Sequence, residues 1–390
     1  MTAVSPVVDS LEPRADVVHL APAFGIYVHI PYCISRCPYC DFNTYVGIED
    51  TAPEYVDALL REAGAWAERA GAREAGSIFI GGGTPSLLDP TLMRKLLDGL
   101  RATFPVSSAA EITIEANPET VDVERLSGFR AAGVNRISFG AQSFRADVLA
   151  TLGRAHTAER TEVAVREARE AGFDNLNLDL IYGTPGESFD DWRMSMEKAI
   201  ALEPEHISAY ALTIEEGTAF GADVASGRMP APDDDDQAAK YELALGLLAA
   251  AGYEHYEISN WAKPGRACRH NLLYWNQGEY AGLGAGAHGH LDAARVWNEK
   301  APRTYIERAP DARAGEERLA EAARHDEWLQ LRLRLVAGLD IDEASRRTGR
   351  DLSPALEHLE RAGLVALANG VAKLTRRGLL LQSEVALRMT

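Results

Sequence analysis

The chain has 390 residues, of which 46% are hydrophobic, enough for one large core and a smaller second one. Its 58 acidic residues outnumber its 40 Lys and Arg, and the formal charge of −18 disfavours nucleic-acid partners, because phosphate binding depends on clustered cations. No stretch has the roughly 18 to 20 apolar residues of a membrane span, and the N-terminus lacks the pattern of a secretory signal, so we expect a cytoplasmic protein.

Residues 1–23 are predicted to be a flexible leader, and residues 24–300 to form the main domain. Up to about residue 258, short apolar runs alternate with segments that carry apolar residues at helical spacing. The predicted strands are 25–30, 77–80, 111–116, 136–140, 175–181 and 206–212, and the helices between them are 53–70, 90–103, 122–132, 158–171 and 189–202. Six successive βα units predict an α/β fold with a parallel sheet, which fits a partial or full barrel and also an open doubly wound sheet.

In both architectures the chemistry gathers at the carboxyl ends of the strands. The unusual residues of this chain follow the first five predicted strands. They are Cys33 to Cys40, Gly81 to Pro85, Glu115 to Pro118, Gly140 to Ser143, and Asp179 with Tyr182 to Pro185. Turn chemistry explains some of the Gly and Pro, but not the cysteines or the acids at the ends of apolar strands.

Two segments after the sixth strand have simple interpretations. The acidic run 230–236 is predicted to be a solvated connector whose aspartates favour the N-terminus of a helix near 238–251. The run Gly282 to Ala287 resembles a dinucleotide fingerprint superficially, but no helix and ribose-binding acid follow it. We interpret this run as close backbone packing or as access to a flat ligand.

Residues 301–390 are predicted to contain a linker, at about 301–317, and a small C-terminal domain. Predicted helices at 342–348 and 353–362 and a strand at 370–375 suggest a winged helix-turn-helix. Such modules often bind DNA, which makes a nucleic-acid-binding module one alternative function. The second helix carries as many acids as bases, so a structural or protein-contact role is favoured.

The strongest signal is the spacing of Cys33, Cys37 and Cys40. Thiolates ligate iron–sulfur clusters, and three ligands on one short loop leave the fourth iron of a cubane open. S-adenosylmethionine (SAM) can chelate such an iron through its amino and carboxylate groups. Structural zinc is the alternative, but it prefers four protein ligands, and the only other cysteine, Cys268, lies over 200 residues away. The spacing therefore predicts a 4Fe-4S cluster.

The residues around these cysteines resemble a known family. Tyr27 to Pro31 lead into Cys33, and Tyr39 precedes Cys40. With the motifs 81–85, 115–118, 138–144 and 179–183, the chain resembles the radical SAM proteins related to oxygen-independent coproporphyrinogen III dehydrogenase (HemN), and more closely the heme chaperones of the HemW family. The resemblance covers about 24–390 and implies a (βα)6 partial barrel followed by a winged-helix-like domain of the HemN type.

The resemblance also implies which residues bind SAM. It assigns the turn with Gly82, Gly83 and Thr84 to the SAM amino group. It gives contacts with SAM to Glu115, Gln142, Arg154 and Asp179, places Tyr27 beside SAM, and counts Tyr39 among the cofactor-binding residues. The chemistry agrees, because a guanidinium binds a carboxylate well and a buried acid at a strand end needs hydrogen-bond donors. A plain turn at the glycines and a surface position for Arg154 are the alternatives.

Two features distinguish the chaperones from the dehydrogenases. Phe42 stands where the dehydrogenases have a further cysteine, and only about two dozen residues precede the first strand. His270 to Trp275 match the HNxxYW pattern of the chaperones. His270 is accordingly expected to contact heme, although it could instead hydrogen-bond a loop. His288 and His290 are rival ligands, whereas Cys268 is expected to be buried.

The resemblance therefore implies a heme chaperone that delivers heme to a respiratory acceptor and lacks dehydrogenase activity. The alternative is a coproporphyrinogen III dehydrogenase that decarboxylates propionate side chains oxidatively. Dimerisation and peripheral membrane association through the acceptor stay open at this stage.

Overall fold

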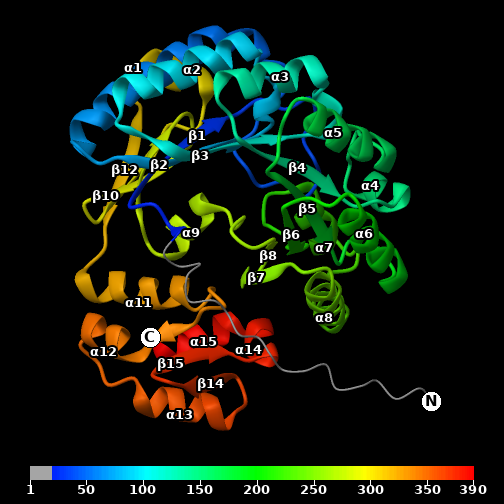
Figure 1. Ribbon diagram of the computed structural model, residues 1–390, viewed down its shortest axis with the longest axis vertical. Coiled ribbons are helices and arrows are strands. Elements are labelled where there is room, and N and C mark those ends of the chain that lie inside the picture. Colours follow the sequence, from blue (N-terminus) through cyan, green and yellow to red (C-terminus); the bar gives the residue numbers. More distant parts are fainter. Residues whose placement is uncertain (1–19) are drawn as a thin grey trace.

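The described part of the protein has two units, a large sheet covered by helices and a smaller unit that contains the C-terminus (Figure 1). The structure, a computed structural model, describes residues 20–390, so most of the predicted leader lies outside the described residues. Within the described part of the chain, no helix combines the length and apolar character that a membrane span requires.

Six parallel strands form the centre of the large sheet, in the order of the sequence. They are β1 (Phe24–Ile30), β2 (Ala75–Gly82), β3 (Val106–Ala116), β4 (Arg136–Gln142), β5 (Leu176–Tyr182) and β6 (His206–Ala211). Side chains on both faces of β1 and β5 are buried, as expected for a parallel sheet that is covered on both sides. The predicted (βα)6 partial barrel is confirmed.

Helices connect these strands and lie along the outside of the curved sheet (Figure 1). They are α1 (Ala52–Ala70), α2 (Pro90–Thr103), α3 (Val123–Ala132), α4 (Ala146–Thr151), α5 (Ala158–Glu170) and α6 (Phe189–Ala201), with short 3-10 turns at Glu49–Thr51, Pro85–Leu87 and Pro118–Thr120. Local sequence sets where they begin: the Asp89 side chain accepts a hydrogen bond from the Thr91 amide, and Ser188 and Asp191 form a capping box.

Further strands widen the sheet at both edges. Beyond β6 lie β8 (Asn260–Ala262) and β7 (Glu254–Glu257), after the helices α7 (Ala219–Ala225) and α8 (Asp234–Ala250). The side chain of Asp233 caps α8, so the helix begins about four residues before the predicted start. At the other edge, β9 (Glu279–Leu283) pairs parallel with β1, and β10 (His288–Leu291) and β11 (Ala294–Asn298) follow. Helix α9 (Arg269–Trp275) precedes β9.

The segment 301–317 is folded, which corrects its interpretation as a linker. It contains α10 (Pro302–Arg308) and β12 (Arg313–Arg318), and β12 pairs antiparallel with β11 as the outermost strand of the large sheet. Five of the six residues of β12 are exposed, and four of the six are charged. Charged side chains are common on edge strands, where they oppose pairing with other chains. Because β12 is so charged, its sequence lacks the apolar pattern by which a strand is predicted.

The C-terminal unit has its own core and a three-stranded sheet with the order β13, β15, β14. Its elements are α11 (Glu321–Arg332), β13 (Leu339–Asp340), α12 (Ile341–Thr348), α13 (Ser353–Arg361), β14 (Val365–Ala368), β15 (Val371–Leu374), α14 (Arg376–Leu380) and α15 (Gln382–Met389). Two helices followed by a β-hairpin confirm the winged-helix-like architecture.

Candidate metal centre and cofactor cavity

A cavity of about 430 Å³ lies at the carboxyl ends of the six parallel strands. Each strand contributes to it directly or through the loop that follows. Of the thirteen residues that the sequence analysis assigned to cluster and cofactors, eleven line this cavity: Cys33, Cys37, Tyr39, Cys40, Gly82, Gly83, Thr84, Glu115, Gln142, Arg154 and Asp179. Tyr27 and His270 do not.

The loop that carries the three cysteines is fixed at its base. The amide of Cys33 donates to the carbonyl of Tyr45 (2.9 Å), and the amide of Tyr45 donates to the carbonyl of Pro31 (2.8 Å). Within the loop, the amide of Cys40 donates to the carbonyl of Cys37 (3.1 Å). These bonds hold the cysteines on one compact loop at the end of β1.

The cysteines are free thiols around one cavity rim. Burial raises the pKa of Cys33 and of Cys40 above the usual thiol value. Across residues 20–390, no three His, Cys, Asp or Glu side chains are grouped as the ligands of one metal ion. A cubane needs a different arrangement, because each thiolate binds a separate iron. Three cysteines on a single loop, facing a cavity, fit that requirement.

The glycines after β2 bring the backbone close to the cysteine loop. A Cβ atom on Gly83 would lie 2.6 Å from the carbonyl oxygen of Tyr32 and 3.0 Å from Cys33 Sγ. Gly82 has a φ of 116°, a region that other residues rarely adopt. Thr84 lies between two partners, because its Oγ1 is 3.5 Å from Cys33 Sγ and accepts a hydrogen bond from the side chain of Asn117 (3.2 Å).

Glu115 and Asp179 both accept hydrogen bonds at the strand ends, as expected for acids that follow apolar strands. The amide of Gly82 donates to Glu115 (3.0 Å), and Ser138 and Asn177 donate to Asp179 (2.7 and 2.9 Å). Burial, together with the charge of Asp179, raises the pKa of Glu115 to about 7. The Glu115 carboxyl is therefore poised to ionise when a cationic ligand enters the cavity.

Arg154 connects the cysteine loop with the ends of two strands. Its guanidinium donates to Cys37 Sγ (3.5 Å), to the carbonyl of Gly140 (3.1 Å) and to the side chain of Asn117. Its Nε is buried without a partner among the described residues. A buried N–H without an acceptor is costly, so this atom suits an anionic ligand group such as a carboxylate.

Asn117 and Ser138 are site residues that the sequence analysis did not single out. Both line the cavity, and they hold Arg154 and Asp179 respectively. Their position in the sequence could have identified them, since each belongs to a polar motif at the end of an apolar strand. Gln142 was expected. It adopts a φ of 61° next to a register shift between β4 and β5, which places it at the cavity rim.

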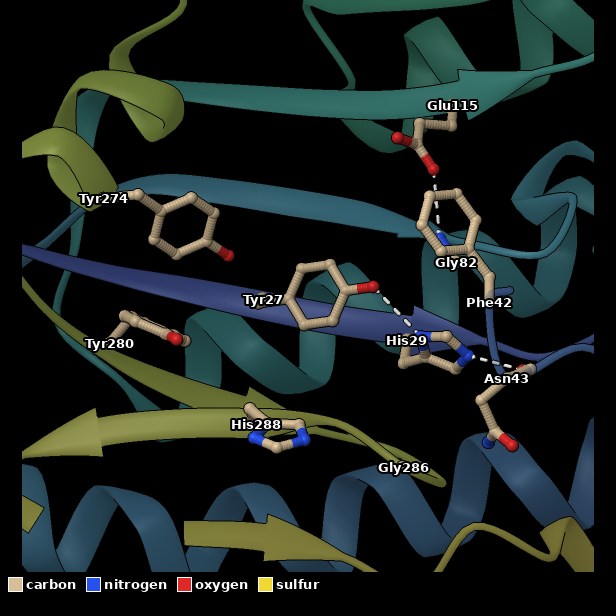
Figure 2. A pocket seen from close by; sticks show the side chains of 10 residues that line it. All are labelled: Tyr27, His29, Phe42, Asn43, Gly82, Glu115, Tyr274, Tyr280, Gly286 and His288. Atoms are coloured by element: carbon tan, nitrogen blue, oxygen red, sulfur yellow. Dashed lines mark hydrogen bonds between the residues drawn. The ribbon is translucent and has the colours of Figure 1, made fainter. Parts of the chain in front are cut away.

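Tyr27 lies in a second cavity, of about 290 Å³, that adjoins the first (Figure 2). The two cavities share Phe42, Gly82 and Glu115 as lining residues. The hydroxyl of Tyr27 is 3.0 Å from His29 Nδ1. The expected place of Tyr27 beside SAM is therefore next to the first cavity rather than in it.

The structure does not support direct contact between His270 and heme. The imidazole is fully buried and lines neither cavity; its Nδ1 is 2.8 Å from Ser77 Oγ and its Nε2 is 2.9 Å from the hydroxyl of Tyr274. Burial lowers the pKa of His270 to about 3. His270 therefore has the alternative role, which is hydrogen bonding inside the protein. Cys268 is buried as expected, and burial raises its pKa to about 12.

The run Gly282 to Ala287 packs closely against neighbouring backbone, as predicted. A Cβ atom on Gly282 would collide with the carbonyl of His288, and one on Gly284 would lie 2.6 Å from the carbonyl of His29. These contacts join β9 to β10 and to β1 and shape the wall of the second cavity.

Comparisons with known proteins agree with this architecture. Residues 27–199 match the model of the radical SAM superfamily, and residues 319–381 match that of the HemN C-terminal domain. The solved structure of coproporphyrinogen III oxidase (HemN) from Escherichia coli superimposes with a TM-score of 0.81 over 96% of this chain and 92% of that chain, at 23% identity. The fold and the cysteine-lined cavity thus define a radical SAM protein with a HemN-type C-terminal domain.

Curated relatives show to which family of radical SAM proteins the chain belongs. The heme chaperone HemW of Mycobacterium tuberculosis is 43% identical over 93% of both chains, and that of Bacillus subtilis is 37% identical over 92% of this chain and 97% of the relative. The Escherichia coli HemW is 46% identical over 69% of this chain and 70% of its own length. This chain belongs to the HemW family.

Proposed function

We propose that this protein is a heme chaperone, which binds heme and transfers it to an acceptor protein. The observation that carries the proposal is the 43% identity to a heme chaperone over 93% of both chains, so that the likeness includes both units of the fold. Phe42, in place of the further cysteine of the dehydrogenases, supports the same function.

The cavity residues fit a 4Fe-4S cluster with exchangeable SAM. The cluster, when bound, supplies an open iron that SAM chelates, and it can pass an electron to SAM. Cys33, Cys37 and Cys40 would each hold one of the other irons. Arg154 would offer its Nε, which has no partner among the described residues, to the carboxylate of SAM, and Glu115 would offer its carboxylate to the sulfonium group.

The acceptor, the cellular location and the oligomeric state belong to the same proposal. We expect a respiratory hemoprotein as the acceptor, because it matches the role implied by the family resemblance. A cytoplasmic protein that reaches the membrane through its acceptor would suit such a delivery, and a dimer is compatible with it.

A dehydrogenase is the competing function, since HemN shares the fold, but an identity of 23% supports the fold alone. One experiment separates the two functions. Full-length protein is reconstituted with iron and sulfide without oxygen and is then either titrated with hemin or incubated with coproporphyrinogen III, SAM, a reductant for the cluster and an electron acceptor.

For a chaperone, the titration gives a saturable Soret band, and apoprotein of a heme-dependent acceptor takes up the bound heme. Incubation with coproporphyrinogen III and SAM then yields no protoporphyrinogen IX. Formation of that product, or the absence of any saturable heme binding, would contradict the proposal.

A further inference from the structure

The second cavity has the composition of a site for a flat aromatic ligand. Tyr27 comes from β1, Phe42 from the cysteine loop, Tyr274 from α9 and Tyr280 from β9, and their rings surround the space in Figure 2. Aromatic rings of this kind pack well against an extended π-system. A volume of about 290 Å³ is at the lower end of the range for small-molecule sites, so a porphyrin would enter by one edge and stay partly exposed.

Iron coordination needs an imidazole nitrogen with a free lone pair at the cavity, and three nearby histidines do not offer one. Both ring nitrogens of His270 have partners inside the protein. His29 lines the cavity, but its Nδ1 is 3.0 Å from the hydroxyl of Tyr27 and its Nε2 is 2.9 Å from the carbonyl of Asn43. His290 lines neither cavity, and its Nδ1 is 3.0 Å from the carbonyl of Gly278.

His288 is different. It is exposed at the start of β10 and lines the second cavity, where its ring lies opposite Tyr27 and His29 (Figure 2). Within residues 20–390, neither of its ring nitrogens has a hydrogen-bond partner. The ring stacks on Trp297, with centroids 5.8 Å apart and planes inclined by 24°, and this contact limits its motion.

The charge state of His288 also suits a ligand. Burial, and then the nearby cations Lys300 and Arg295, lower the pKa of this imidazole. It is therefore neutral at physiological pH, and a neutral imidazole is the form that coordinates iron.

We infer that His288 is the axial ligand of the heme iron, with the porphyrin edge held among the aromatic rings of the second cavity. The inference rests on the proposed chaperone function and specifies its binding site. His270 then acts as a positioning residue, because its Nε2 fixes the hydroxyl of Tyr274, one wall of that cavity. The exposed position of His288 leaves the iron side of the site accessible for transfer.

The test compares three variants of the full-length, cluster-loaded protein by hemin titration, following the Soret band and the electron paramagnetic resonance of the ferric heme. His288→Ala should lose the spectral signature of histidine ligation, and added imidazole should restore it by occupying the vacated space. His290→Ala is the matched control, two residues along the same strand, and should keep the signature. His270→Ala should keep the signature too, with a weaker affinity for hemin, because the Tyr274 wall of the cavity loses the hydrogen bond that fixes it.

Circular dichroism and the cluster absorption check that each variant is folded. If the unsubstituted protein binds no heme, the proposed function itself fails. If it binds heme and His288→Ala gives the same spectrum and the same Kd, the chaperone function stands and the inference is wrong. A lost signature in His270→Ala that imidazole restores, with His288→Ala unaffected, would assign the iron to His270 and overturn the inference.

Discussion

Glu115 is the acidic side chain that lines both cavities, and its ionisation should control SAM binding. Its pKa of about 7 means that the carboxyl is mostly protonated at pH 6 and mostly ionised at pH 8. The sulfonium group of SAM favours the ionised form. We therefore expect SAM affinity to rise by about tenfold between pH 6 and pH 8, measured by calorimetry under anaerobic conditions.

The control for this expectation is Glu115→Gln, in which SAM binding should be weaker at pH 8 and nearly independent of pH over the same range. Stability should respond in the opposite direction to binding. The folded-state pKa lies above the ordinary value of 4.5, so the contribution of Glu115 to stability falls as the pH rises from 4.5 through about 7. An equally steep pH dependence of SAM affinity in the variant would show that another group is responsible.

The residues whose place at the cavity could be predicted are those that the local sequence pattern puts at the ends of strands. The three cysteines lie on one loop, and Glu115 and Asp179 end strands that the local pattern identifies. His270 could not be placed in this way, because its partner Ser77 lies 193 positions away. Only the fold shows that these two side chains meet.

The turn after β2 offers a test at the level of the structural element. Gly83→Ala would place a Cβ atom 2.6 Å from the carbonyl oxygen of Tyr32, a backbone atom that cannot rotate away. The turn and the cysteine loop must then move apart. We expect a loss of about 1 to 3 kcal/mol in the free energy of unfolding, as for other overpacked sites, and a lower content of iron and sulfide after reconstitution.

Gly64→Ala provides the matched control for the turn. Gly64 lies within α1, and nothing is within 4 Å of the position that its Cβ would take. That variant should be more stable by up to about 1 kcal/mol, because alanine favours helix more than glycine does, and its cluster content should not change. Urea denaturation and iron and sulfide analysis measure both effects. Full cluster content in Gly83→Ala would contradict this account of the turn.

Among the elements, the six central strands were predictable because apolar runs and helical spacing are local signals. The edge strands were harder. β9 pairs parallel with β1 although they are far apart in sequence, and β12 is too charged to be recognised as a strand without its partner β11. One wall of the second cavity comes from β9 and β10, so the cavity could not be foreseen even though His288 had been noted as a rival heme ligand.

On the scale of the whole molecule, the two units are joined by an interface that mixes apolar and charged contacts. Leu335 packs with Tyr256 and Leu272 in an apolar cluster separate from the main cores. The amide of Val336 donates to the carbonyl of Tyr256 (3.1 Å). These contacts attach the segment after α11 to β7 and to α9, the helix that carries His270 and Tyr274.

An ion pair with one fully buried member lies in this interface. Arg334 Nη2 is 3.2 Å from Glu257 Oε2, and the Glu257 side chain has no exposed surface. The guanidinium also lies 4.4 Å from the ring centre of Trp275. Burial raises the pKa of Glu257 while Arg334 opposes the rise, so loss of the cation would leave an unpaired buried carboxylate.

Arg334→Met keeps much of the side-chain volume but removes the charge. We expect it to lower the free energy of unfolding at pH 7.5 by about 3 kcal/mol, and to separate the unfolding of the two units into distinct steps in urea. The deficit should shrink toward pH 5, because protonation of Glu257 removes the unpaired charge. Adding Glu257→Gln should recover more than half of the loss for the same reason.

The control is Arg228→Met, which breaks the exposed pair with Asp223 and should change stability by less than about 0.5 kcal/mol. Purely additive effects of the two interface substitutions, or a deficit that does not vary with pH, would show that this ion pair does not couple the two units.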